Sequence, residues 1–177
     1  MVQSDSSKAP KSSVRDDAES CDRLWGMIKR HRFAMMATLH PGKTLRSRPM
    51  TTIQKEFDGS LWFFAKSDSA VAEAIVLNQQ VCLSYGDAEA MDFVCVAGPA
   101  QLVVDAEMKK RLWSPPVQAW FPEGAESPGV VLIRVKPDHA EYWDSNSNQL
   151  VVLFSLARAI VTGTTPQDIG EHRHVAI

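Results

Sequence analysis

The segment Arg46-Ser47-Arg48-Pro49-Met50 carries the residue types best suited to hold a ligand. Side chains two residues apart on a strand point to the same face, so Arg46 and Arg48 would present two guanidinium groups side by side. Two planar groups with several N–H donors each match the geometry of a phosphate group. The spacing by itself favours a simpler role, in which the arginines protect an exposed edge strand that Pro49 marks.

Other chemistries find little support in the sequence. It contains no Walker loop, no GxGxxG fingerprint and no GxSxG elbow, so the motifs that usually indicate nucleotide hydrolysis or esterase activity are absent. His172-Arg173-His174 lies near the C-terminus without a third ligand type at a recognised spacing. We therefore expect a frayed tail at this point and no metal site.

The cysteines indicate a reducing environment. Cys21, Cys82 and Cys95 have no CxxC spacing, and an odd number leaves at least one thiol without an intramolecular partner. We expect a cytoplasmic protein, since disulfides are rare in that compartment. Cys82 and Cys95 lie in apolar strand segments and are predicted to be inert buried thiols.

Charge and hydropathy exclude several partners. The chain of 177 residues has 19 basic and 21 acidic side chains, a net charge of -2, so it has no global positive field for nucleic acid or anionic lipid. The mean hydropathy is -0.17. The most apolar segment, residues 150–161, is far shorter than the roughly 20 residues needed to span a bilayer. We expect a protein that contacts neither nucleic acid nor membrane.

The elements that must position the arginines follow from periodicity and turn residues. We expect helices over residues 16–32, 69–78, 105–113 and 149–160, and a loop or short helix around 120–124. Strands are expected over residues 33–39, 45–54, 61–65, 81–85, 93–97, 100–104, 130–135 and 140–143. Many short strands with few helices predict an antiparallel barrel, closed or partly closed. Residues 1–15 are predicted to be a disordered tail, 16–165 a single domain and 166–177 a C-terminal tail.

An ordered set of motifs gives a more specific interpretation. In sequence order they are FAMMATL (33–39), LRSRPM (45–50), DGSLWFFAKSDS (58–69), QVCLSY (80–85), VAGPAQLV (96–103), WFPEG (120–124) and AEYWD (140–144). Together they resemble the general stress protein branch of the pyridoxamine 5'-phosphate oxidase-like FMN-binding split-barrel superfamily. The resemblance implies a mainly β fold with flanking helices, an antiparallel split barrel, and a homodimer that holds FMN at its seam.

The resemblance also assigns roles to individual residues. Arg46 and Arg48 look like the ligands of the FMN phosphate, and residues of the following strand would approach the isoalloxazine ring. Many relatives carry a phosphate-neutralising lysine at the position of Val71, and Lys66 is the candidate to replace it. The full set of implied cofactor-binding residues is Arg46, Ser47, Arg48, Pro49, Met50, Trp62, Phe63, Phe64, Ala65, Lys66, Ser67 and Asp68.

Three functions remain open on the sequence. The first is a flavin-dependent protein of oxidoreductase type, in which positioning alone supports hydride transfer because no dedicated acid or base is visible. The second is a non-catalytic carrier or stress-linked sensor of FMN, or of the larger FAD. Pyridoxamine phosphate oxidation is the weakest, since no second basic cluster stands in the ordered context needed to hold a substrate phosphate opposite the flavin. Among the tryptophans, Trp25 and Trp143 are predicted to be core residues. For Trp113 and Trp120 two positions stay open, the flavin mouth and a subunit interface, of which the interface is favoured.

Overall fold

The structure is a computed structural model that describes residues 14–144 and 171–175. The helices are α1 (Val14–His31), α2 (Ala70–Leu77), α3 (Ala106–Leu112) and α4 (Pro115–Trp120), with a short 3-10 turn, η1 (Pro41–Lys43). The strands are β1 (Phe33–His40), β2 (Thr44–Thr51), β3 (Leu61–Lys66), β4 (Gln80–Asp87), β5 (Asp92–Val103), β6 (Val130–Val135), β7 (His139–Asp144) and β8 (Glu171–Val175). The predicted helix over 149–160 lies outside the described residues.

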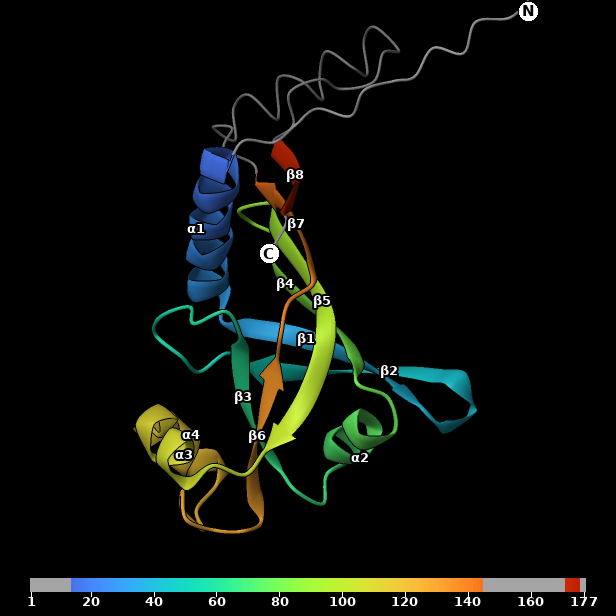
Figure 1. Ribbon diagram of the computed structural model, residues 1–177, viewed down its shortest axis with the longest axis vertical. Helices are drawn as coiled ribbons and strands as arrows, with labels where there is room; N and C mark the ends of the chain where they lie inside the picture. Colours follow the sequence, from blue (N-terminus) through green and yellow to red (C-terminus); the bar gives the residue numbers. More distant parts are fainter. Residues whose placement is uncertain (1–13, 145–170, 176–177) are drawn as a thin grey trace, which may run out of the picture.

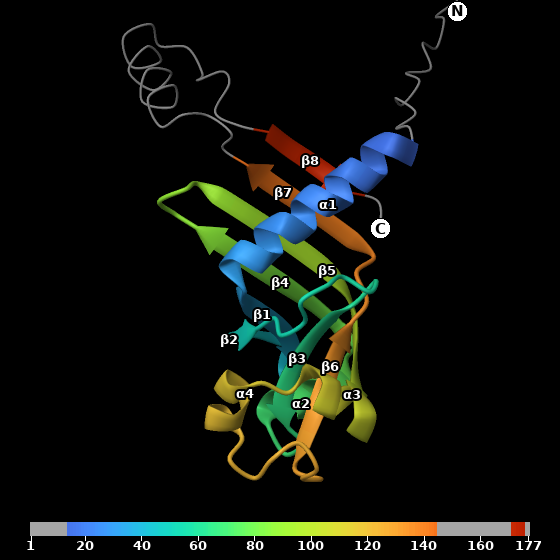
Figure 2. The same ribbon diagram turned by 90° about the vertical axis from the view of Figure 1, so that its left-hand side faces the viewer.

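A single antiparallel sheet forms the body of the molecule. Its strand order is β2-β1-β4-β5-β6-β3, and β7 pairs with both β5 and β8. The sheet curls into a half-barrel. In Figure 1, β1 and β2 run across the molecule, at a large angle to β5. Helix α1 lies across β4, β5 and β8 (Figure 2). The predicted mainly β architecture with flanking helices is therefore confirmed.

The curl brings the two ends of the strand order together. Ile53, which follows β2, donates its backbone N–H to the carbonyl of Trp62 on β3 at 3.2 Å. The Trp62 N–H donates in turn to the side-chain oxygen of Gln54 at 3.1 Å. The sequence predicts a strand as far as Gln54, but β2 ends at Thr51 because the chain there leaves its ladder with β1 and bonds to β3 instead.

Strand β5 differs from the sequence prediction. Two strands were expected, interrupted at Gly98-Pro99, whereas β5 runs unbroken from Asp92 to Val103. Its first half pairs with β7 and its second half with β6, so the strand spans the bend of the sheet. At the changeover, a Cβ on Gly98 would collide with the Lys136 carbonyl, and the Pro99 carbonyl accepts the Lys136 N–H at 3.0 Å. Glycine and proline therefore allow a close backbone approach here without ending the strand.

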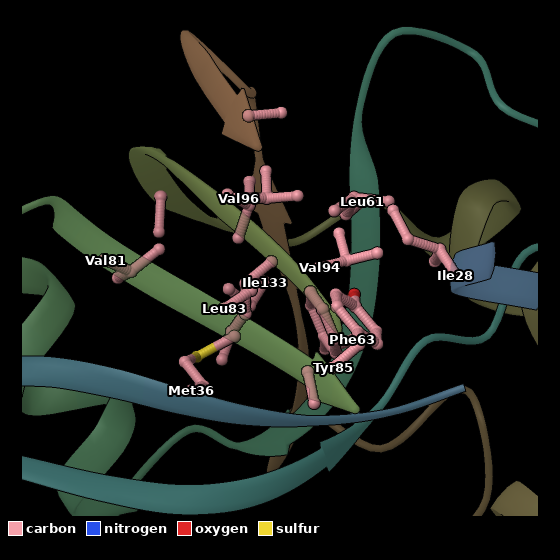
Figure 3. Packing of buried hydrophobic residues seen from close by; sticks show 14 of the residues in the cluster. Ile28, Met36, Leu61, Phe63, Val81, Leu83, Tyr85, Val94, Val96 and Ile133 are labelled. Carbon is pink, nitrogen blue, oxygen red and sulfur yellow. The ribbon is translucent and has the colours of Figure 1, made fainter. Parts of the chain in front are cut away.

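The main core fills the concave side of the sheet. Figure 3 shows Phe63, Leu61 and Ile133, from the β3–β6 half, facing side chains of β1, β4 and β5. Helix α1 adds Leu24, Met27 and Ile28, and α2 adds Val71 and Ile75. The main core is therefore formed jointly by both halves of the sheet and by two helices.

A second, smaller core lies on the other face of β3 and β6. It contains Trp62, Phe64, Val117, Val130 and Leu132, with side chains of α3 and its flanking segments packed against it. Because β3 and β6 are covered on both faces, nearly every residue of these strands is buried. The other strands alternate between buried and exposed residues, as expected for a sheet covered on one face.

The end of the chain adds a strand to the sheet. Strand β8 falls within residues 166–177, which the sequence analysis assigned to a tail, and it pairs in antiparallel register with β7. At the other end, α1 already begins at Val14, two residues before the predicted start. Within the described ranges, none of the helices has the length and apolar character that crossing a membrane requires.

Two tryptophans predicted to be core residues behave differently. Trp25 is partly buried against the main core, with its ring centroid 5.8 Å from that of Phe57. The prediction for Trp143 is wrong, because its side chain is 38% exposed. Strand alternation explains the error: Tyr142 occupies the inward position, so Trp143 points outward with Phe93, its partner on β5.

Cys82 and Cys95 lie on neighbouring strands with their sulfur atoms 3.4 Å apart. Both are half-buried rather than fully buried as predicted. Desolvation, followed by the hydrogen bond with Cys82, raises the pKa of Cys95 to about 12. The Cys95 thiol is therefore protonated at neutral pH, which makes it a poor nucleophile.

Candidate functional site

The two arginines of β2 share the inward side of the barrel wall. Pairing with β1 places Arg46 opposite Thr38 and Arg48 opposite Met36, and both β1 residues are buried. Directly paired residues project to the same face of a sheet. The arginines therefore extend from the concave face, at its rim, where Arg46 is exposed and Arg48 half-buried. The expected side-by-side arrangement of the two side chains is consistent with this register.

Neighbouring residues of the same segment divide between the two faces. Met50 shares the face of Arg46 and Arg48 and packs against the main core. Ser47 and Pro49 project from the opposite face, since they pair with Ala37 and Met35. Of the residues predicted to line a flavin wall, Met50 therefore lies on the arginine side and Ser47 and Pro49 on the outer side.

Arg48 is held in place by two side chains of β1. Its Nη1 donates to Thr38 Oγ1 at 3.1 Å, and its Nη2 lies 3.1 Å from His40 Nε2. Thr38 Oγ1 and His40 Nε2 are themselves 3.3 Å apart. Arg46 makes no such contact with a described side chain. Arg48 is thus oriented before any ligand arrives, whereas Arg46 is free to move.

The pair carries positive charge that no nearby carboxylate compensates. Among the described residues, no acidic side chain lies within ion-pair distance of Arg46 or Arg48. Desolvation and then the charge of Arg46 lower the pKa of Arg48. A guanidinium nevertheless stays protonated at any physiological pH. Two adjacent cations, one of them half-buried, without a counter-ion among the described residues are able to attract an anion.

Helix α2 packs against β1, the strand that pairs with β2. Its N-cap is Ser69, whose hydroxyl accepts the Ala72 N–H at 3.4 Å and donates to the Lys66 carbonyl at 2.6 Å. The helix predicted over 69–78 is confirmed as α2, and of the possible N-caps at positions 67, 68 and 69 the structure selects Ser69. In its first turn, Glu73 is close enough to His40 to affect the pKa of that imidazole. The first turn of α2 therefore lies near His40.

Val71 does not face the solvent at this helix start. Its side chain is 5% exposed and belongs to the main core, beside Ile75. Lys66, the candidate to replace the lysine that relatives carry at this position, is exposed at the end of β3. By strand alternation it leaves on the side of Trp62 and Phe64, opposite to the main core. Ser67 and Asp68 are exposed in the turn that follows.

Strand β3 offers its backbone edge rather than its side chains. Trp62, Phe63, Phe64 and Ala65 are all buried, in one or the other core. The backbone N–H and carbonyl of Trp62 point away from β6. Backbone groups alternate in direction along an antiparallel ladder, so the N–H and carbonyl of Phe64 point toward the same unpaired edge of β3. Outside the strand ladders, the described residues provide no backbone partner for Phe64. This edge has one donor and one acceptor available to a planar polar ring.

The aromatic segment after α3 covers the far side of β3. The ring of Phe64 lies 5.1 Å from that of Trp113 in an edge-on arrangement, and 5.9 Å from that of Phe121. Trp113 donates its ring N–H to Gln118 at 2.9 Å. Trp120, in contrast, is 79% exposed. Trp113 thus packs within the chain, and Trp120 has the exposure that an interface residue requires.

Thr38 and His40 were missed by the sequence analysis. The predicted strand over 33–39 stops before His40, and Thr38 within it is given no polar function. Their signal was present in the alternation, because residues 36, 38 and 40 of one strand share a face. Only the pairing of β1 with β2 reveals that this face also carries the arginines.

This donor set fits the phosphate group of FMN. A phosphate dianion needs several N–H donors and a compensating charge, and the arginine pair provides both. The isoalloxazine ring is flat with polar edges, and the free edge of β3 at Phe64 provides matching backbone groups. The two features are joined by contacts between β2 and β3.

Comparison with known proteins defines the class to which this fold and site belong. The structure overlays with a TM-score of 0.71 on a general stress protein 26 from Jannaschia sp. CCS1, which is 24% identical in sequence, over 90% of this chain and 99% of the other. The fold is therefore that of the antiparallel split barrels. A family model described as pyridoxamine 5'-phosphate oxidase like matches residues 19–167, and the chain belongs to this family.

Individual relatives come from fungi and bacteria. General stress protein 26 of Bacillus subtilis is 30% identical over 66% of this chain and 82% of its own length. Protein bli-3 of Neurospora crassa is 27% identical over 86% of this chain and 78% of its own. A general stress FMN/FAD binding protein from Xanthomonas citri is 29% identical, with a TM-score of 0.65 over 74% of this chain and 92% of the other.

Proposed function

We propose that this protein binds FMN, with the phosphate on Arg46 and Arg48 and the isoalloxazine ring against the free edge of β3, and that it acts as a flavin-dependent oxidoreductase. The observation that carries the proposal is the arginine pair, which lies on the concave face without a carboxylate partner among the described residues. The similarity to an FMN/FAD binding protein of Xanthomonas citri supports it.

The residues of the chain divide the work of binding. Arg48, oriented by Thr38 and His40, provides two fixed donors, and the exposed Arg46 closes on the phosphate from its other side. Met50 and the Phe64 backbone would set the position of the ring. Bound FMN supplies the hydride chemistry, and the protein supplies orientation and electrostatics. No acid or base is assigned, because the β3 side chains nearest the ring are apolar and buried.

A homodimer is also proposed, with an interface on the outer face of the sheet, which differs from the seam around FMN that the resemblance implies. On the outer face of the sheet, pairing aligns Phe33 and Met35 of β1 with Phe93 and the half-buried cysteines of β4 and β5. Phe33 is 68% exposed, Leu45 72% and Met35 46%, and no described element packs on this face. Apolar surface of this kind marks an interaction site, and a twofold interface between identical chains is the commonest solution. We also propose a cytoplasmic location, in keeping with an odd number of cysteines that lack CxxC spacing.

Titration of the purified protein with FMN, followed by flavin fluorescence, tests the proposal. The double variant Arg46→Ala/Arg48→Ala should lose most of the affinity for FMN. Arg134→Ala is the matched control, because Arg134 lies on β6 and bonds to Gln101, away from the pair. Riboflavin, which lacks the phosphate, should bind the parent weakly and be unaffected by the double substitution. Equal FMN affinity of the parent and the double variant would refute the assignment.

A non-catalytic carrier or sensor of FMN or FAD is the second candidate function. It is favoured by the apolar, buried side chains of β3, because they leave no acid or base near the proposed position of the ring. Anaerobic addition of NADPH to the FMN-loaded protein separates the two functions. Bleaching of the flavin absorbance with turnover supports an oxidoreductase, and a spectrum that stays oxidised with all donors tested supports a carrier. Oxidation of pyridoxamine phosphate remains the least supported activity.

A further inference from the structure

His40 forms the third corner of a hydrogen-bonded triangle with Arg48 and Thr38. The guanidinium of Arg48 has only donors, so His40 Nε2 must be the acceptor of their 3.1 Å contact, and the ring carries its proton on Nδ1. Thr38 Oγ1 accepts from Arg48 and can donate its own proton to the same Nε2 at 3.3 Å. This network requires a neutral imidazole.

The charges around the imidazole also favour the neutral form. From β2, it faces Arg46 and Arg48; from α2, it faces Glu73; and its β1 neighbour Thr38 is uncharged. Desolvation and then the two arginines lower the pKa of His40 below its ordinary value, and Glu73 opposes them with a smaller effect. A proton on Nε2 would place an N–H against the N–H groups of Arg48.

A bound phosphate reverses this balance. Its oxygens can accept hydrogen bonds from Arg48 and from a protonated Nε2 together, so the two donors no longer oppose each other. Its negative charge also offsets the arginines, and an opposite charge within about 4–6 Å shifts a pKa toward the charged form by about 1–3 units. Phosphate binding therefore favours the protonated form of the His40 imidazole.

We propose that His40 is a proton-linked member of the phosphate site: neutral and orienting Arg48 when the site is empty, it takes up a proton when a phosphate group binds to Arg46 and Arg48. This inference rests on the phosphate site proposed above. By linkage, a group that takes up a proton on binding makes the affinity rise as the pH falls. A rise of about one unit in the pKa of His40 corresponds to about tenfold in affinity.

The direct test is an NMR titration of the imidazole signals, with the His40 signal assigned through the His40→Gln variant. The pKa of His40 should rise on saturation with FMN, and also with inorganic phosphate. His139 is an internal control, because it lies on the outer face of the sheet, bonded to Glu141. Neither ligand should change its imidazole signals.

Binding measurements give a second, independent readout. Glutamine keeps an oxygen that can accept from Arg48 but takes up no proton, so the ratio of FMN dissociation constants, His40→Gln over parent, isolates the linkage. The titration of the FMN phosphate itself cancels in this ratio. Between pH 8 and pH 5.5 the ratio should grow by up to about tenfold for a one-unit pKa rise. His139→Gln should give a constant ratio.

The outcomes separate this inference from the flavin proposal. If FMN binds but leaves the pKa of His40 unchanged and the ratio constant with pH, the proton linkage is wrong and the flavin site stands. If FMN does not bind but inorganic phosphate raises the pKa of His40, the flavin proposal fails and the proton-linked anion site is retained. If FMN does not bind and inorganic phosphate leaves the pKa of His40 unchanged, both proposals are overturned.

Discussion

Replacing Arg48 should weaken FMN binding more than replacing Arg46, although the two residues carry the same charge on the same strand face. Arg48 is half-buried and held by Thr38 and His40, whereas Arg46 is exposed and without a described partner. An arginine that must be immobilised on binding gives up about 0.5–1.5 kcal/mol of side-chain entropy. Arg48 has already lost that freedom in the folded protein.

The magnitude follows from the strength of the contacts. A hydrogen bond to a charged group contributes about 1.5–3 kcal/mol, so Arg48→Ala should raise the FMN dissociation constant by roughly tenfold to a hundredfold. The immobilisation cost reduces the contribution of Arg46 to about 0.5–2 kcal/mol, or roughly twofold to thirtyfold. The Arg46 contribution should also fall more steeply with added salt, because exposed charges are screened.

Fluorescence titration with FMN at low and at high ionic strength measures both effects. Circular dichroism of each variant shows whether the fold is retained, and Arg134→Ala controls for the loss of one positive charge. If Arg46→Ala weakens binding as much as or more than Arg48→Ala, the preorganisation of Arg48 does not contribute to affinity. If neither substitution has an effect, the phosphate lies elsewhere.

Three further expectations concern stability and assembly. Gly98→Ala should destabilise the fold by about 1–3 kcal/mol or more, because the new Cβ collides with the Lys136 carbonyl, and an unchanged midpoint in urea denaturation would contradict the close approach. Val71→Lys should lower the melting temperature, because it places an ammonium group in the main core. The control Val76→Lys, at a position 71% exposed, should change the free energy of unfolding by no more than about 0.5 kcal/mol. Equal effects of the two substitutions would show that Val71 is not a core position. Met35→Glu, which puts a charge on the apolar outer face, should shift the proposed homodimer toward monomers in sedimentation velocity, and a dimer that persists in this variant would place the interface on another surface.

The amino-acid sequence alone determined the local elements and the pairing of Arg46 with Arg48 on one strand face. The extent of helix α2 could be predicted because helical spacing and a polar residue before the first turn are local signals, and the structure then selects Ser69 as the N-cap. Alternation on a strand is equally local, since covalent geometry turns successive side chains to opposite faces. Such features need no knowledge of what the strand packs against.

Tertiary structure decided which face of each strand lies on the concave side of the sheet and which side chains of the neighbouring strands lie beside it. Alternation cannot say whether the arginines or Ser47 and Pro49 face the concave side; the register with β1 settles that question and brings in Thr38 and His40. The same holds for Trp143, which is as apolar as a core residue but occupies the outward position of β7. Gly98 and Pro99 normally end a strand, yet β5 continues through them because Lys136 approaches from a segment nearly forty residues later in the chain. Each of these outcomes depends on contacts between residues far apart in sequence, which no local pattern contains.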